Sequence, residues 1–175
     1  MAGKRLQLVS VGSPPMALLK ELEEPLLTQM GVTAVMGKVP LTTPTYAFNK
    51  TRNQYHSDAI MRRLIPLMES GQRYVLGVTD VDLFVPDAAF VFGEADRESR
   101  AAVFSIFRLR QGAEGEVLKR RTQIESVHQT GHLLGLSYCE DPRCVMFLVT
   151  APADCDRRSV ALCNVCRNEL AKLNR

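Results

Sequence analysis

Two of the chain's three histidines, His128 and His132, are four residues apart, which is about one turn of a helix. On a helix, both imidazoles project from the same face and can bind one metal ion. An isolated pair with this spacing is more often two polar residues on a helix flank, so the neighbours decide its meaning. Gly135 lies seven residues after His128, where a glycine can end the helix in a left-handed turn. The chain can then fold back toward the histidines, which favours a metal site.

All five cysteines lie near the C-terminal end of the chain, and four of them form two closely spaced pairs. Cys139 and Cys144 have four residues between them, Cys163 and Cys166 have two, and 18 residues separate the pairs. This spacing predicts a tetrahedral zinc site with four thiolate ligands. Two disulfides or merely buried thiols are the alternatives. Cys155 is left over, and we expect it to be a free thiol.

Together these residues resemble the metzincin signature H-E-x-x-H-x-x-G-x-x-H of zinc proteases. The resemblance narrows to the archaemetzincins, in which the zincin helix is followed by C-x4-C-x-M and then by a distant C-x2-C. It implies a zinc peptidase with a catalytic metal on the helix and one structural zinc. The matching positions are His128, His132, Gly135, Cys139, Cys144, Met146, Cys163 and Cys166.

Two positions depart from the archaemetzincin motif. The glutamate that follows the first histidine in the family is Gln129 here, and the third histidine ligand is Tyr138. In a zincin the metal lowers the pKa of a bound water, and the glutamate accepts the proton of that water. A glutamine amide cannot accept a proton at neutral pH, and general acid–base help is typically worth about 10²–10⁴ in rate. We therefore expect hydrolysis to be impaired or lost.

The missing third histidine weakens the expected catalytic metal site, because catalytic zinc usually has three protein ligands. We expect His128 and His132 to hold this zinc weakly or to be empty. Tyr138 could supply a phenolate ligand or be an ordinary pocket-lining aromatic. Glu125 could be a carboxylate ligand, could orient an imidazole, or could simply pack on the helix. Met146 stands where the family has its Met-turn, a packing residue beneath the metal.

The elements that must position these residues alternate between short apolar runs and helical patterns. Their order, β-α-β-α-β-β-β-α, predicts an α/β fold. With the resemblance, it indicates a zincin-like mixed five-stranded twisted sheet with backing and active-site helices. We expect Pro25 to kink or split the first helix. The predicted strands span 6–11, 32–39, 74–79, 90–92 and 102–109, and the predicted helices span 16–30, 54–70, 117–134 and a stretch within 157–173.

The chain's 175 residues argue for one zincin-like domain. Composition changes after Gly135, so we expect residues 1–135 to form a sheet and helix lobe that ends in the active-site helix. Residues 136–175 should form a small C-terminal lobe stabilised by the four-cysteine zinc. No apolar run approaches the roughly 20 residues that span a bilayer, and the N-terminal segment lacks a signal-peptide core. These features exclude a membrane partner and place the protein in the cytoplasm.

The sequence leaves three functions to weigh. The resemblance implies a zinc metallopeptidase homologue that acts on or binds peptides, and the alternative is a non-catalytic pseudoprotease that keeps the peptide cleft. In zincins a strand such as 90–92 edges the cleft and pairs with extended peptide, although this run could equally be an interior strand. A nucleic-acid module is disfavoured, because the net charge is only +3 and no aromatics interleave the basic run 119–121.

Overall fold

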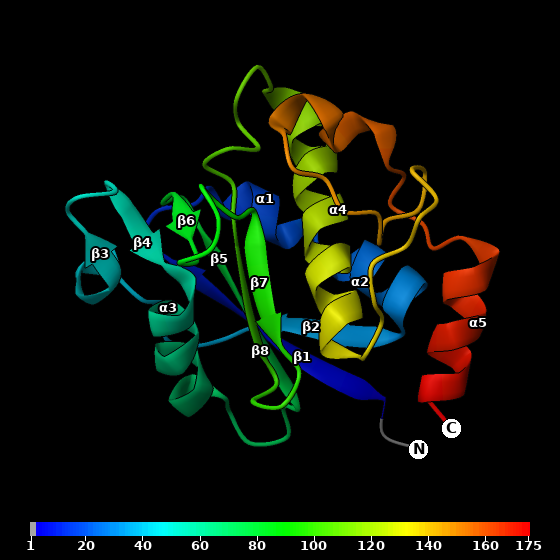
Figure 1. Ribbon diagram of the computed structural model, residues 1–175. Helices are drawn as coiled ribbons and strands as arrows, with labels where there is room; N and C mark the ends of the chain where they lie inside the picture. The colour runs from blue at the N-terminus through cyan, green and yellow to red at the C-terminus, as the bar shows by residue number, and fades with distance from the viewer. Residues whose placement is uncertain (1–2) are drawn as a thin grey trace.

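The computed structural model describes residues 3–175 and has the expected α/β architecture, built around one mixed five-stranded sheet. The strand order is β2-β1-β5-β8-β7, and only β7, at one edge, runs antiparallel to its neighbour. Figure 1 shows β7 beside the long helix α4. The sheet strands are β1 (Lys4–Val11), β2 (Val32–Met36), β5 (Tyr74–Thr79), β7 (Gly93–Asp96) and β8 (Ala101–Ser105).

Helices cover both faces of this sheet, and the alternation of side chains along β1 shows why. Leu6 and Leu8 pack in the larger core with the helices α1, α2 and α4, whereas Val9 and Val11 pack in a second core under α3. Burial on both faces explains why the central strands read as continuous apolar runs. The helices are α1 (Met16–Lys20), α2 (Glu23–Met30), α3 (Ser57–Leu64), α4 (Gly115–Leu133) and α5 (Asn164–Leu173).

The larger core continues past α4 into the C-terminal segment. Met146, Val149 and Leu170 belong to the same buried cluster as Ile124 and Val127 of α4. This segment has little regular structure before α5 except the 3-10 helix η3 (Pro152–Arg157). Its side chains therefore complete the core under α4, while the division of the chain at residue 135 stays a prediction.

The predicted strand at residues 90–92 is wrong, and the edge strand is β7. Within the run, Val91 forms an isolated bridge to Leu83, and the carbonyl of Phe92 accepts the backbone N–H of Ser105 at 2.8 Å. Phe92 is buried in the core, and Phe90 lies under the guanidinium of Arg108, 3.9 Å from the ring centroid. The apolar residues of this run therefore pack against other side chains instead of forming a ladder. The true edge strand is polar, because an edge strand is only partly covered.

The first predicted helix is split into two helices, but the break comes before Pro25 and not at it. The break falls at Glu21–Leu22, and Pro25 is the third residue of α2. Backbone N–H groups in the first turn of a helix have no partner inside the helix, so a proline there removes no hydrogen bond. The break before α2 lets both short helices lie against the sheet.

Other boundaries also differ from the prediction. Residues 54–56 form the strand β4 (Gln54–His56), and the helix α3 ends at Leu64, before the 3-10 turn η2 (Ile65–Leu67) that contains a proline. β8 ends at Ser105, whose hydroxyl accepts a hydrogen bond from the Phe107 backbone N–H and donates one to Val81. This local bonding turns the chain out of the sheet.

A small second sheet, of order β3-β4-β6, was not predicted. It joins the short strands β3 (Phe48–Asn49) and β6 (Leu83–Phe84) to β4, and the 3-10 helix η1 (Thr45–Ala47) leads into it. Strands of two or three residues leave no periodic pattern in a sequence. Within residues 3–175, no helix combines the length and hydropathy needed to cross a membrane.

Candidate functional site

The second half of α4 carries the predicted metal-binding histidines and is buried in the molecule. His128 and Gln129 are each 4% exposed. Gly135 follows the helix with a φ of 107°, so the expected left-handed turn is confirmed. After this turn the chain folds back, and the backbone N–H of Leu136 donates to the carbonyl of Gly131 at 2.9 Å. The next residues are thereby returned to the face of α4 that carries the histidines.

The imidazoles of His128 and His132 face each other, with their Nε2 atoms 3.1 Å apart. Each Nδ1 lies 2.8 Å from a backbone carbonyl, of Val145 for His128 and of Leu136 for His132. A carbonyl can only accept, so a proton on each Nδ1 completes both of these hydrogen bonds and leaves the Nε2 lone pairs for a metal. His128 Nδ1 also lies 3.3 Å from Arg158 Nη1, a longer contact than the one to Val145. Two ligands of a tetrahedral zinc, each about 2.0–2.1 Å from the ion, are about 3.4 Å apart. The pair therefore fits a shared metal ion.

The protonation of this pair also suits metal binding. Burial lowers the pKa of His128 to about 4, and burial likewise lowers the pKa of His132. Both imidazoles are therefore neutral at pH 7. A metal competes with fewer protons for a ligand that is already neutral.

Tyr138, at the third-ligand position of the archaemetzincin motif, lies beside both imidazoles. Its ring centroid is 4.6 Å from that of His132 and 5.7 Å from that of His128. The side chain is 58% exposed, and partial burial raises the pKa of its phenol. The phenol therefore keeps its proton at neutral pH. The sequence placed Tyr138 next to the histidines correctly, but its role as a ligand stays a prediction.

Gln129 and Glu125 belong to a buried hydrogen-bond network that includes Arg158. Gln129 Nε2 donates to Glu125 Oε1 at 2.8 Å, and Arg158 Nη2 donates to Glu125 Oε2 at 3.2 Å. Both carboxylate oxygens of Glu125 are thus engaged away from the metal position, and His128 Nδ1 is oriented by Val145 instead. Glu125 is neither a free ligand nor the partner of an imidazole, so these two readings of it are not supported.

Arg158, which is 1% exposed, could not be recognised as a site residue from the sequence. Its neighbour Arg157 has the same residue type and is exposed, so nothing local separates the two. Burial alone would raise the pKa of Glu125, but interactions with His128 and Arg158 and the hydrogen bond from Gln129 lower it overall. Glu125 is therefore an ionised carboxylate whose charge is balanced by Arg158.

Met146 packs beneath α4 against Gly131, which lies between the two histidines in the sequence. A Cβ added to Gly131 would lie 2.5 Å from Met146 Sδ and 3.2 Å from Met30 Cε. Met146 is fully buried, and its carbonyl accepts the backbone N–H of Cys139 at 3.0 Å. Met146 therefore links the floor under the histidine pair to the start of the cysteine segment, as a Met-turn residue would.

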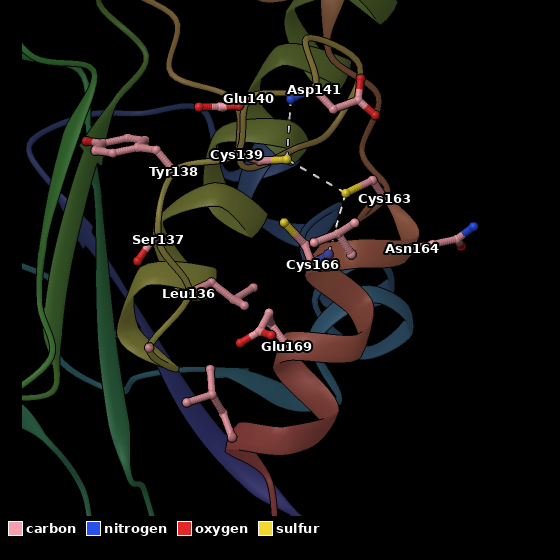
Figure 2. A pocket seen from close by; sticks show the side chains of 13 residues that line it. Leu136, Ser137, Tyr138, Cys139, Glu140, Asp141, Cys163, Asn164, Cys166 and Glu169 are labelled. Atoms are coloured by element: carbon pink, nitrogen blue, oxygen red, sulfur yellow. Dashed lines mark hydrogen bonds between the residues drawn. The ribbon is translucent and has the colours of Figure 1, made fainter.

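The four paired cysteines come together next to this segment. Their sulfur atoms all lie within 4.8 Å of one another, and Cys139 Sγ is 3.7 Å from Cys163 Sγ. Two thiolates on a tetrahedral zinc, each about 2.3 Å from the ion, are about 3.8 Å apart. Figure 2 shows Cys139, Cys163 and Cys166 converging, while Tyr138 points away from the sulfur atoms. The cluster can bind one structural zinc.

The N-terminus of α5 helps to present two of these sulfurs. Cys163 is the residue that precedes α5, and its Sγ accepts the backbone N–H of Cys166 at 3.5 Å. That hydrogen bond lowers the pKa of the Cys163 thiol, which favours the thiolate that zinc requires. All five cysteines are free of disulfides. Cys155 lies outside the cluster, and burial raises the pKa of its thiol to about 11, which keeps the thiol protonated at neutral pH.

Two cavities meet at the histidine pair and form a cleft along β7. One of about 200 Å³ lies between the Phe90–Gly93 segment and α4, where Gln129 and Arg158 line it. The other, of about 420 Å³, follows β7 and is lined by Arg97, His132 and Tyr138. β7 is the last strand of the sheet, so one of its edges is free to pair with an extended chain.

Comparison of this chain with protein-family models and with similar proteins identifies its family. The model of peptidase family M54 matches residues 29–172, which is most of the chain. Archaemetzincin from Methanocaldococcus jannaschii is 35% identical over 171 residues, which cover 95% of this chain and 92% of that protein. The chain belongs to the archaemetzincin family.

Solved archaemetzincin-family structures have the same fold. The crystal structure of archaemetzincin from Methanopyrus kandleri superposes with a TM-score of 0.84 at 32% identity, covering 98% of this chain and 95% of that one. The zinc-dependent peptidase from Methanocorpusculum labreanum gives a TM-score of 0.84 at 25% identity, covering 94% and 99% of the two chains. The zincin-like fold and the zinc chemistry expected from the resemblance are therefore confirmed for the family.

Proposed function

We propose that this archaemetzincin-family protein binds peptide or protein segments in the cleft along β7 and hydrolyses them weakly or not at all. The observation that carries the proposal is the hydrogen bond from Gln129 Nε2 to Glu125 Oε1. At the position where the family has its proton acceptor, this chain has an amide whose nitrogen is already turned toward a buried carboxylate. This amide nitrogen is a hydrogen-bond donor and cannot accept a proton from water.

Two sets of residues would hold zinc in this proposal. The four clustered cysteines would hold a structural ion, and His128 and His132, with Tyr138 beside them, would hold a second ion weakly. A zinc ion at the histidines supplies Lewis acidity toward a carbonyl and lowers the pKa of a bound water. The chain's own residues orient the imidazoles, through Val145 and Leu136, and exclude solvent, through the burial of His128.

Peptide binding is supported by the shape of the cleft and by the free edge of β7. An extended peptide can add to an exposed strand through main-chain hydrogen bonds, while pockets take alternate side chains. The cavity lined by Phe90 and Val149 offers an apolar pocket at one end of β7. Binding through backbone groups needs neither Gln129 nor a metal, so it can persist where hydrolysis is lost.

A carboxylate elsewhere does not replace the missing base in this proposal. Glu125 is the nearest buried carboxylate on α4, but Arg158 and Gln129 occupy its two oxygens. The alternative of a nucleic-acid module is further disfavoured, because the basic run at the start of α4 is engaged in the fold. Arg121 is 5% exposed and pairs with Asp156, and Lys119 pairs with Glu21.

The test is to rebuild the family motif in this chain. The double variant Gln129→Glu with Tyr138→His should cleave a peptide library at least about 10²-fold faster than the wild type, which is the low end of general-base catalysis. Adding His128→Ala to this variant should abolish the gained activity and thus assign it to the histidine site. If the wild type cleaves as fast as the double variant, the proposed loss of hydrolysis is wrong. If the double variant binds zinc and peptide but gains no activity, Gln129 and Tyr138 are not what silences the site.

A further inference from the structure

A group of four cations lies beyond the end of β7, around a pocket of about 290 Å³. Lys4 comes from β1, Arg73 from the turn before β5, and Arg97 and Arg100 from the turn between β7 and β8. We call this the basic pocket. These residues are far apart in sequence, so their convergence is a property of the fold and is invisible in the sequence.

The cations of the basic pocket have no carboxylate partners. Within residues 3–175, none of the four forms an ion pair, although Glu98 also lines the pocket. Lys4 donates to the amide oxygen of Asn174, and the Arg73 guanidinium lies 5.7 Å from the ring centroid of Tyr74. Burial and the charges of Arg73 and Arg97 lower the pKa of Lys4. Like charges are thus close enough to repel one another.

Helix ends alone do not balance this charge. α4 and α5 both end at the pocket, where Leu133 and Leu173 line it, and the C-terminus of a helix carries about half a negative charge. Together with Glu98, which also lines the pocket, the two helix ends supply about two negative charges against four positive ones. The remaining charge gives the pocket a positive potential that attracts an anionic group.

Arg97 connects the basic pocket to the peptide cleft. It lines the cleft together with His132 and Tyr138, and it also lines the basic pocket. Its guanidinium lies flat against Gly135, where an added Cβ would be 2.7 Å from Arg97 Cζ. Gly135 therefore serves two purposes, because it ends α4 and leaves room for Arg97 between the histidine pair and the basic pocket.

We propose that the basic pocket binds acidic side chains of the peptide that occupies the cleft. This inference rests on the proposed peptide binding. β7 runs from Gly93, beside Gln129, to Asp96, beside Arg97. The proposal includes the direction of the peptide, which adds antiparallel to β7 and so has its N-terminal part at the Asp96 end. The pocket therefore selects acidic residues on the N-terminal side of the peptide segment that lies at His128 and His132.

The test uses three matched extended peptides and the zinc-loaded wild-type protein, with affinity measured by fluorescence anisotropy. One peptide has two aspartates near its N-terminus, the second has them near its C-terminus, and the third has asparagines in their place. The N-terminal acidic peptide should bind about 10-fold more tightly than the other two, and added salt should reduce the difference. Arg100→Gln and Arg97→Gln should each reduce this preference. Arg62→Gln, on the exposed surface of α3, should leave it unchanged.

The outcomes separate this inference from the proposed function. Equal binding of all three peptides, or a preference for the C-terminal aspartates, would overturn the role of the basic pocket and leave peptide binding intact. Failure of every peptide to bind would contradict the proposed function and with it the inference. Inorganic phosphate should compete with the N-terminal acidic peptide more strongly than with the asparagine peptide. Phosphate binding that leaves both affinities unchanged would also overturn the inference.

Discussion

Gln129 and Glu125, one turn apart on α4, are joined by a hydrogen bond of 2.8 Å from the amide nitrogen to the carboxylate. The other oxygen of Glu125 accepts a hydrogen bond from Arg158 Nη2, so both carboxylate oxygens are paired in a buried wall of the cleft, whereas Arg158 Nε is buried without a partner. The negative charge in this wall belongs to Glu125 and not to the residue after the first histidine. Restoring a glutamate at position 129 would place a second carboxylate beside the first.

The single variant Gln129→Glu should therefore be less stable than the wild type when no metal is bound to the histidines. It loses the amide donor and places like charges together, which we expect to cost about 1–3 kcal/mol at pH 7. Repulsion raises the pKa of one carboxyl in the folded state, so the loss should shrink as the pH falls below that raised pKa and the carboxyl is protonated. Urea unfolding at several pH values measures this.

The matched control for that variant is Gln129→Leu, which removes the donor without adding charge. Its deficit should stay nearly constant over the same pH range. If Gln129→Glu and Gln129→Leu show the same pH dependence, the two carboxylates do not interact, and the account of the buried wall fails.

Gly131 is needed for close packing of Met146 under α4. Gly131→Ala should destabilise the protein by about 1–3 kcal/mol through overpacking, although alanine is the better helix former by about 1 kcal/mol. The reason is that the new Cβ would lie 2.5 Å from Met146 Sδ. In the double variant with Met146→Ala, the cost of Gly131→Ala should largely disappear in a thermal-unfolding cycle. A stabilising Gly131→Ala in the wild-type background would show that the helix and Met146 separate easily.

The cysteine cluster and the leftover cysteine make a matched pair for testing the structural zinc. Cys163→Ser should lower the zinc content by one ion per chain and lower the unfolding temperature. Cys155→Ser should leave the zinc content unchanged, because Cys155 is buried outside the cluster. Elemental analysis of both purified variants checks this. Equal zinc content in Cys163→Ser and the wild type would remove the cluster as a zinc site.

Arg121 and Asp156 connect α4 to η3 through two hydrogen bonds of 2.9 and 2.8 Å. The side-chain hydrogen bonds from Arg121 lower the pKa of Asp156 from its ordinary value of 3.8. A lowered folded-state pKa contributes stability above the unfolded value, and this stability is lost as the pH falls through the folded value. Asp156→Asn should therefore be less stable than the wild type at about pH 7, and the two should converge once the pH falls below the lowered folded-state pKa of Asp156. If Asp156→Asn stays less stable than the wild type at acidic pH, the loss of stability comes from packing and not from the carboxylate charge.

Much of the fold could be predicted from the sequence where burial sets the pattern. The central strands β1 and β5 are covered on both faces and appear as apolar runs, and Gly135 marks the end of α4 because a left-handed turn needs glycine there. β7 could not be found, because its residues, GEAD, are half-exposed and have no apolar period. The short strands β3 and β6 depend on pairing with β4, which no local pattern encodes.

Among the site residues, too, some could be recognised from the sequence and others could not. His128, His132 and the cysteine pairs are recognisable because metal ligation imposes residue types and spacings within a short stretch. Arg158 and the basic pocket are not, because their partners come from distant elements and an arginine has no local signature of burial. Glu125 was noticed from its position on α4, but only the structure shows that Arg158 and Gln129 hold its two carboxylate oxygens.

The central claim is that the cleft binds peptide without cutting it, and mass spectrometry of a bound peptide tests this most directly. Zinc-saturated wild-type protein would be incubated with an extended peptide that it binds, and the peptide would then be recovered and weighed. The account predicts that the peptide is recovered intact, while the Gln129→Glu, Tyr138→His variant cleaves it under the same conditions. Cleavage by the wild type that disappears in His128→Ala would contradict the account.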